Sequence, residues 1–333
     1  MLSSSVLLFV LIGLALLFDY LNGFHDSSNI VATMISSRAM SPRQALSMSA
    51  VAHFAAPFLF GTAVAKTVGE EVVAPHSVTT EVIMAALLSA IVWNVLTWLL
   101  SIPSSSSHAL VGGIVGAASL EAGPGVIRLD GLTKVVVALF FSPIAGLVVG
   151  YAFMKLVLFL VRGASPQVNL WFKRLQVVTA LGLALSHGTN DAQKTMGIIT
   201  MALVSSRYLS GFRVPWWVIG LSAGAIALGT ASGGWRLIRT LGTKFYKIRP
   251  IHGFTTQAAS AAVILGAALL GGPVSTTQVV SSAILGVGSG ERVSKVRWGV
   301  AREIALAWLL TIPASAAMAA LLYLGLSYVH IGQ

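Results

Sequence analysis

The sequence predicts an all-α integral membrane protein of two inverted-topology repeats, each with broken transmembrane helices and a re-entrant-type helical hairpin. Three observations support this fold class. Of the 333 residues, 56% are hydrophobic and only 9% are charged, whereas soluble domains contain about 25% charged residues. Two polar motifs each occur twice in apolar surroundings. The basic loops are spaced so that the two halves must cross the membrane in opposite directions.

The duplication is visible in both motifs. Residues 22–29 have a counterpart in residues 187–194, which places Asp26 and Asp191 165 positions apart. Residues 103–108 have a counterpart in residues 273–278, at an offset of 170. Duplicated membrane domains with polar, helix-breaking interruptions are typical of secondary transporters, which build a central site from two repeats.

The apolar segments are long enough to form membrane helices. Residues 82–100, 135–161 and 216–231 approach or reach the roughly 20 residues that a span requires. The apolar segment 7–18 lacks the basic start and the cleavage site of a signal peptide, so we expect a retained helix. The chain contains no cysteine, which excludes disulfides and thiolate metal sites. We attribute the net charge of +11 to cytoplasmic loops rather than to nucleic-acid binding.

Loop charges predict the orientation. Loops 38–43, 162–174, 233–250 and 291–302 are basic, whereas loop 68–81 carries Glu70, Glu71 and Glu81 without Lys or Arg. With basic loops in the cytoplasm, both termini lie outside and the centre lies inside. Each half then crosses an odd number of times, so the repeats must be inverted. Arg207 and Arg213 are the exceptions to this scheme.

The same counting predicts one hairpin in each half. Segment 82–120 must leave and return on one side, turning at residues 103–107, and segment 251–290 turns at residues 271–273. We therefore divide the chain into a first repeat (1–161), a short cytoplasmic linker (162–174) and a second repeat (175–333).

Asp26 and Asp191 lie within the apolar segments 5–37 and 177–204. An ionised Asp at the bilayer centre costs about 2.5–3.5 kcal/mol on insertion scales. Carboxylate and amide oxygens suit hard cations, and membrane carboxylates also relay protons. The alternative is a pair of buried carboxylates that serve packing. We expect the following residues to bind the coupling cation: Asp26, Asn29, Asn190, Asp191 and His25. Asp19, one turn before the first motif, is a further acid near this site.

Hydroxyl-rich runs follow the two prolines at 103 and 273 and open new apolar segments. Pro favours the first helical turn and Ser or Thr the N-cap, so two helix N-termini should point into the protein, where they can bind an anion. The alternative is ordinary capping of buried turns. Lys194 is the only Lys or Arg that this topology leaves within a membrane segment, where it either pairs with Asp191 or contacts the anion. The predicted anion-binding residues are Ser104, Ser105, Ser106, Ser107, Ser275, Thr276, Thr277, Lys194 and Gln193.

These motifs together resemble those of the PiT family of inorganic phosphate transporters, from about residue 19 to residue 324. The resemblance rests on Asn-Gly-Phe-His-Asp at 22–26, Pro-Ser-Ser-Ser-Ser-His at 103–108, Ser-His-Gly-Thr-Asn-Asp at 186–191 and Pro-Val-Ser-Thr-Thr at 273–277. It implies inverted repeats, hairpin tips that hold the anion (104–108 and 274–278) and cation sites at the Asp motifs. The His-Asp form of the first motif is similar to bacterial low-affinity permeases, whereas sodium-coupled members commonly have Asn-Asp.

The functional hypothesis is import of inorganic phosphate by cation symport. Hydrogen phosphate beside Asp26 and Asp191 would be repelled by about 4 kcal/mol per charge pair at 4 Å and an effective dielectric constant near 20, so a cation must enter with it. Protons, with phosphate free or metal-bound, are favoured over sodium. A sulfate permease on the same scaffold is the main alternative. An intramembrane hydrolase is a remote one, because Gly-x-Ser-x-Gly and His-Glu-x-x-His motifs are missing.

We therefore expect a multi-pass protein of a bacterial or archaeal plasma membrane that is not an enzyme. Its expected partners are inorganic phosphate, the coupling cation and the lipid bilayer. Nucleic acid is not expected. A homodimer and a monomer are both compatible with the sequence. No cofactor and no dedicated metal site are expected beyond the co-transported cation, a proton or sodium.

Overall fold

The computed structural model describes residues 4–73, 78–243 and 247–331, and within these it is helical, without a strand. The first half contains α1 (Ser4–Ser36), α2 (Pro42–Leu59), α3 (Ala63–Lys66), a π-helical turn η1 (Thr67–Glu71), α4 (Thr80–Leu99), α5 (Ser106–Ala122), a 3₁₀ turn η3 (Pro124–Val126) and α6 (Leu129–Leu160). The second half contains α7 (Val168–Ser205), α8 (Trp216–Ser232), α9 (Trp235–Thr243), α10 (Pro250–Leu269), α11 (Thr276–Arg292), a 3₁₀ turn η4 (Val293–Lys295) and α12 (Trp298–Ile331). Apart from η1, the element order is the same in both halves.

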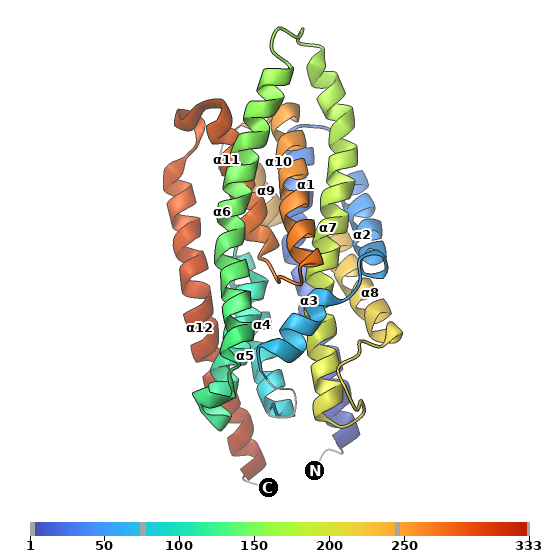
Figure 1. The fold of residues 1–333 in the computed structure, drawn as a ribbon, viewed down its shortest axis with the longest axis vertical. Helices are drawn as coiled ribbons and strands as arrows, with labels where there is room; N and C mark the ends of the chain where they lie inside the picture. Colours follow the sequence, from blue (N-terminus) through green and yellow to red (C-terminus); the bar gives the residue numbers. More distant parts are fainter. Residues whose placement is uncertain (1–3, 74–77, 244–246, 332–333) are drawn as a thin grey trace.

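Equivalent helices run in opposite directions (Figure 1). Helices α1 and α6 ascend from the end where both termini lie, whereas α7 and α12 descend from the opposite end, where α6 connects to α7. The all-helical fold class with inverted repeats is thereby confirmed. Residues 74–77 and 244–246, in two of the loops whose charges set the predicted orientation, lie outside the described residues.

Four helices among the described residues are long and apolar enough to cross a membrane by themselves: Val6–Ser36 of α1, α4, α6 and Trp298–Tyr328 of α12. Two further spans are bent, α2 with α3–η1 by 75° and α8 with α9 by 69°. These bends are the broken helices of the predicted fold class.

The polar motifs, in contrast, do not break their helices. Helix α1 continues through Asp26 and α7 through Asp191. Neither motif contains proline, and the Ser27 and Ser28 hydroxyls donate hydrogen bonds to the backbone carbonyls three residues earlier. The polar groups of α1 are thus accommodated on a regular helix, and proline is what a sharp break in a helix usually requires.

Two helical hairpins, α4–α5 and α10–α11, occupy the predicted positions. Each turns at a residue with positive φ, Ser101 (57°) and Gly271 (71°), which are 170 positions apart. The returning helix is capped by a Ser hydroxyl in both cases. Ser105 accepts from the His108 amide at 3.1 Å and Ser275 from the Gln278 amide at 3.3 Å. The predicted helix N-termini inside the protein are therefore present.

Each hairpin packs on the long helix of the opposite half, α5 on α12 and α11 on α6. Glycines permit the close approach. A Cβ atom on Gly286 would lie 2.1 Å from the Leu147 carbonyl oxygen, and one on Gly116 would lie 2.3 Å from the Ala316 carbonyl oxygen. Close backbone contact of this kind drives helix association in membranes. The two halves are therefore interlocked and are not packed side by side as separate units.

Candidate functional site

The two acidic motifs and the two hairpin tips meet inside the protein. Helices α1 and α7 supply Asp26 and Asp191, and the starts of α5 and α11 supply hydroxyl groups. All of the predicted site residues are buried. The structure is thus closed around this cluster on every side.

Asp26 is held by the second hairpin tip and by its own neighbour. Its Oδ1 accepts a hydrogen bond from Thr277 Oγ1 at 2.8 Å and lies 3.0 Å from His25 Nδ1. Its Oδ2 lies 3.3 Å from Thr276 Oγ1. A residue of the first half is therefore bonded to the hairpin of the second half.

Asp191 shares a contact with Asp26. Its Oδ2 lies 3.0 Å from the same Thr276 Oγ1 and 3.2 Å from His187 Nδ1. The His187 ring also faces Asp26, with Nε2 4.0 Å from Oδ2. One ligand atom each from Asp26, His187 and Asp191 lies within 4.8 Å of the other two. Two carboxylates and an imidazole at this spacing can hold a cation or share protons.

Lys194 joins both hairpin tips to this acidic group. Its ammonium donates to the Asp191 carboxylate, to Ser107 Oγ at 2.6 Å and to the Val274 carbonyl at 2.9 Å. Both alternatives raised for this residue are thus compatible with its position: it pairs with Asp191 and it reaches both tips.

The hairpin tips touch each other, and the second of the two contacts below joins repeat-matched positions, 108 and 278. Ser107 Oγ donates to the Val274 carbonyl at 3.2 Å, and His108 Nε2 lies 3.5 Å from Gln278 Nε2. Ser106 Oγ donates to Asn22 Oδ1 at 2.6 Å. The N-termini of α5 and α11, with their free amide groups and partial positive charge, therefore face a common point.

Not every predicted anion-binding side chain faces this point. Ser104 Oγ donates to Thr97 in its own hairpin at 2.8 Å. The Gln193 side-chain oxygen accepts from the Val64 and Ala65 amides and so caps α3. Ser105 and Ser275 use their hydroxyls as N-caps. The structure brings together Ser106, Ser107, Thr276, Thr277 and Lys194.

The motif amides bind the second tip and retain free oxygens. Asn29 Nδ2 donates to Thr277 Oγ1 at 3.0 Å, and Asn190 Nδ2 donates to the Gly272 carbonyl at 3.1 Å. The Oδ1 atoms of both residues are buried without a hydrogen-bond partner, as is His25 Nε2. A buried oxygen without a hydrogen-bond donor lowers the stability of the fold. The two amide oxygens are therefore suitable ligands for a cation.

Two contacts were not predicted from the sequence. His187 lies between the two carboxylates, and Asn22 positions the first hairpin tip. Both residues belong to the repeated motifs, but the motifs alone do not indicate which side chains these two residues contact. Their partners lie far away in the sequence, so the contacts themselves required the structure.

A chain of polar contacts extends from the cluster toward the end where α6 connects to α7. Gln257 donates to Thr33 at 2.9 Å and accepts from Thr179 at 2.8 Å, and Ser37 donates to Gln176 at 2.8 Å. The repeat-matched positions on the terminal side are apolar and belong to a hydrophobic cluster: Leu87, Ile198, Leu14, Ala202 and Leu11. The two sides of the cluster thus differ in polarity.

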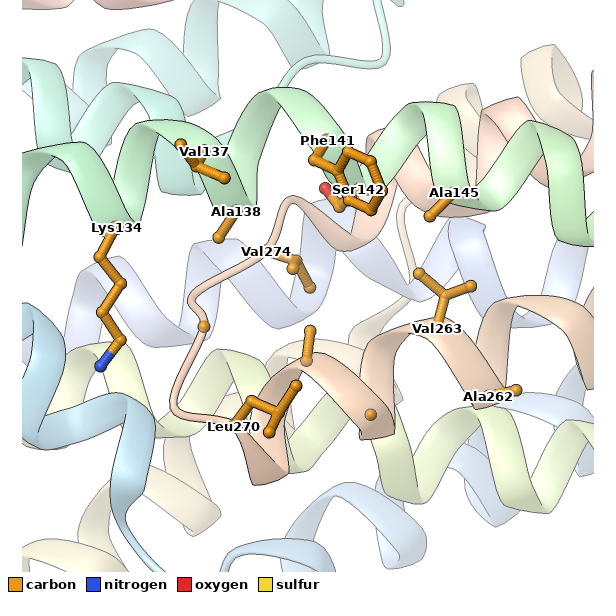
Figure 2. Close-up of a pocket in the computed structure, with 13 residues that line it drawn as sticks. Lys134, Val137, Ala138, Phe141, Ser142, Ala145, Ala262, Val263, Leu270 and Val274 are labelled. Atoms are coloured by element: carbon orange, nitrogen blue, oxygen red, sulfur yellow. The ribbon is translucent and has the colours of Figure 1, made fainter.

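An apolar groove of about 540 Å³ flanks the second hairpin tip between α6 and α10 (Figure 2). Val274 and Leu270 lie on its hairpin side, and Phe141 lies on α6. Lys134 lies at one end, where its ammonium contacts Thr67 and Glu71. The hydrophobic lining is unsuited to an anion, but the groove leaves the tip free of close packing on this side.

The chain is similar to known proteins in both sequence and fold. The profile of the Phosphate transporter family matches residues 22–319. A probable low-affinity inorganic phosphate transporter of Bacillus subtilis (strain 168) is 44% identical over 322 residues, covering 96% of both chains. A protein of the same description from Rhizobium meliloti (strain 1021) is 47% identical over 319 residues, covering 95% of this chain and 96% of that one. A solved structure described as a sodium-dependent phosphate transporter superposes with a TM-score of 0.87 at 23% identity, covering 97% of this chain and all of that one.

Proposed function

Because the chain belongs to the phosphate transporter family, we propose that it imports inorganic phosphate by cation symport, with alternating access between its two inverted repeats. The observation that carries the proposal is the meeting of two hairpin N-termini at Lys194, directly beside the paired carboxylates Asp26 and Asp191. In symport the binding of the anion must depend on the binding of the cation. An anion site in contact with a cation site provides this dependence.

Membership of the family confirms the resemblance to inorganic phosphate transporters that the motifs indicated. The relatives are transporters, which also confirms that the chain is not an enzyme. The chain is accordingly a multi-pass membrane protein. We assign it to a bacterial or archaeal plasma membrane, as monomer or homodimer, with 1–161 and 175–333 as the moving repeats around the 162–174 linker.

Phosphate is held, in this proposal, between the hairpin tips. The hydroxyls of Ser106, Ser107, Thr276 and Thr277 would donate to its oxygens, together with the first backbone amides of α5 and α11. Lys194 would add one positive charge. Charge-assisted hydrogen bonds of this kind contribute about 1.5–3 kcal/mol each. Ser104, Ser105, Ser275 and Gln193 would act by capping and positioning, since their side chains already have other partners.

The coupling cation is assigned to the carboxylates. Asp26 and Asp191 carry two negative charges, whereas Lys194 carries one positive charge. An incoming dianion increases this excess of negative charge and is repelled by it. Asn29 and Asn190 provide unpartnered amide oxygens nearby. Cation entry would offset this repulsion, so the two ions bind well only together. Two imidazoles, His25 and His187, contact the carboxylates, and an imidazole nitrogen can accept a proton, which favours protons over sodium.

The decisive measurement is uptake of radiolabelled phosphate into proteoliposomes, with sodium and pH gradients imposed separately. We expect accumulation driven by a pH gradient, with free or metal-bound phosphate. Accumulation driven by sodium at equal pH would refute proton coupling. Equal competition by sulfate would favour the sulfate permease, and lack of any phosphate movement would refute the proposed function.

The carboxylates are tested by Asp26→Asn and Asp191→Asn. Each substitution keeps size and removes one charge, so cation affinity should fall by roughly 10–150-fold, the equivalent of a lost charge-assisted bond of about 1.5–3 kcal/mol. Both variants should insert and purify normally. Full gradient-driven accumulation by the double variant would exclude these residues as the cation site.

A further inference from the structure

Asp19 is a buried acid outside the cluster described above. It lies on α1 with no solvent exposure, and among the described residues neither carboxyl oxygen has a hydrogen-bond partner at normal distance and angle. The repeat-matched position on α7 is Ala184, so Asp19 is not part of the duplicated framework. The duplication therefore does not account for it.

Asp19 shares a face of α1 with the cluster. Asp19, Asn22 and Asp26 are spaced i, i+3 and i+7, which places them in one row along the helix. Because α1 begins at the terminal end of the molecule, Asp19 lies between that end and Asp26 (Figure 1). From α7, the charged groups acting on it are Asp191 and Lys194. The Thr195 hydroxyl of α7 lies beside it and is the side-chain donor that approaches its carboxylate.

The other helices packed on α1 bring few titratable groups. Helix α8 has none. Helix α4 has Glu81 in its first turn, near Glu121, and α2 has His53, stacked on His187, and Arg43 near its start. The remaining titratable groups on α9, α10 and α11 are Arg236, Arg239, His252, Glu291 and Arg292. The charged groups that act on Asp19 are thus an acid and an ammonium that are already paired with each other.

An ionised carboxylate with a single hydroxyl beside it is expensive in such surroundings, whereas the protonated acid is tolerated. A metal cation is a poor alternative, since a hard cation takes about six oxygen ligands and one carboxyl and one hydroxyl are too few. We propose that Asp19 binds a coupling proton in addition to the cation at Asp26 and Asp191: its carboxylate takes a proton from water when the terminal side is open, is buried as the neutral acid on closure, and returns the proton to water on the other side.

Lys194 provides the link to the anion. The same ammonium can stabilise the ionised form of Asp19 or serve Asp191 and the hairpin tips. When the Lys194 ammonium binds at the hairpin tips, its positive charge stabilises the Asp19 carboxylate less. The protonated form of Asp19 is then favoured. In this way proton binding and anion binding strengthen each other. The inference rests on the proposed function, because it assigns a residue to its coupling step.

The test separates net transport from exchange in proteoliposomes with the membrane potential clamped. For wild type, each proton coupled to phosphate should raise the accumulation that a pH difference of one unit supports about tenfold. Asp19→Asn imitates the protonated acid permanently. It should exchange external labelled phosphate for internal phosphate within about twofold of the wild-type rate, yet accumulate about tenfold less phosphate per unit of pH difference. Asp19→Glu should restore accumulation, and Asp130→Asn, at an exposed acid, should behave as wild type.

Accumulation by Asp19→Asn with the wild-type dependence on the pH gradient would overturn the assignment. So would loss of exchange in Asp19→Asn without rescue by Asp19→Glu, because that pattern indicates a structural role. Wild-type accumulation that responds to sodium alone would overturn it as well. A wild-type protein that does not exchange phosphate at all would instead refute the proposed function, which makes the two failures distinguishable.

Discussion

The Thr276 hydroxyl contacts Asp26 and Asp191 at the same time, at 3.3 and 3.0 Å. A hydroxyl has only one proton to donate. The second contact is favourable only if that carboxyl carries a proton or a cation lies alongside. Thr276 thus connects the occupancy of the acidic pair to the position of the second hairpin tip.

Replacing Thr276 by Val should weaken phosphate binding by roughly 10–150-fold, because one charge-assisted hydrogen bond worth about 1.5–3 kcal/mol is lost. The measurement is the phosphate concentration that gives half-maximal exchange. Thr276→Ser should retain most of the affinity. Thr256→Val provides a matched control, since the Thr256 hydroxyl is buried but makes no hydrogen bond. An unchanged affinity in Thr276→Val would exclude the tip as the anion site.

The residue types of the candidate site were predictable from the sequence, because similar polar residues occur at equivalent positions in both halves. Their partners were not. Gln193 caps α3 and Thr277 bonds to Asp26, and neither contact leaves a trace in the local sequence. A hydrogen bond between segments distant in the chain depends on how the helices pack, which a single sequence does not specify.

At the scale of elements, the contact of α11 with α6 depends on glycine. The equivalent positions Gly116 and Gly286 keep the 170-residue offset, and both lie where a backbone carbonyl of the opposite half approaches. The offset was visible in the sequence as a sign of duplication. Its cause, close helix packing, became visible only in the structure.

Gly286→Ala should destabilise the protein, because the added Cβ would lie 2.1 Å from the Leu147 carbonyl oxygen and overpacking costs about 1–3 kcal/mol. The readout is the apparent melting temperature in detergent. Gly182→Ala is the matched control, because a Cβ there meets nothing within 4 Å and Ala is the better helix former. Equal melting temperatures for the two variants would contradict the packing argument.

An ionic cluster closes the base of the α10–α11 hairpin, outside the membrane-spanning segments. Glu291 contacts Arg249, His252 and Lys295. Burial, followed by the Arg249 charge, lowers the pKa of His252 to about 4. Partial burial opposes the shift at Glu291, but Lys295 and His252 hold the pKa of that carboxyl at about 2.

This cluster should make stability depend on pH. Between pH 6.5 and 4 the unfolded chain binds a proton at His252 that the folded protein does not, so the free energy of unfolding decreases as pH falls. The Glu291 contribution is lost later, between about pH 4.5 and 2. Going from pH 7 to 5 should cost the wild type about 1–2 kcal/mol more than His252→Gln, measured as apparent melting temperatures. Parallel pH profiles of the two proteins would refute this.

For the whole molecule, loop charges were sufficient to predict inversion, because charge near a span reports its orientation. They could not predict that α5 packs on α12 and α11 on α6. Alignment of the repeats relates equivalent elements but does not say which half a hairpin contacts. The same holds for the polar chain from Thr33 to Gln176, which has no counterpart on the terminal side.

The orientation is tested with single cysteines, which the natural chain lacks. Gly125→Cys lies in the α5–α6 connection at the end of the termini, and Ser165→Cys lies in the α6–α7 connection at the other end (Figure 1). An impermeant maleimide should label the first in intact cells and the second only after permeabilisation. Labelling of both in intact cells would contradict the inversion, and the reverse pattern would contradict the assigned orientation.

The contact between the two hairpin tips has a consequence for ancestry. Ser107 meets Val274 and His108 meets Gln278 between the two inverted halves, so each half contributes only part of the proposed binding surface. A half-length chain could complete such a surface only by pairing with a second copy inserted upside down. Gene duplication with fusion fixes that antiparallel pair in one polypeptide, and each half can then diverge, as Asp19 opposite Ala184 illustrates.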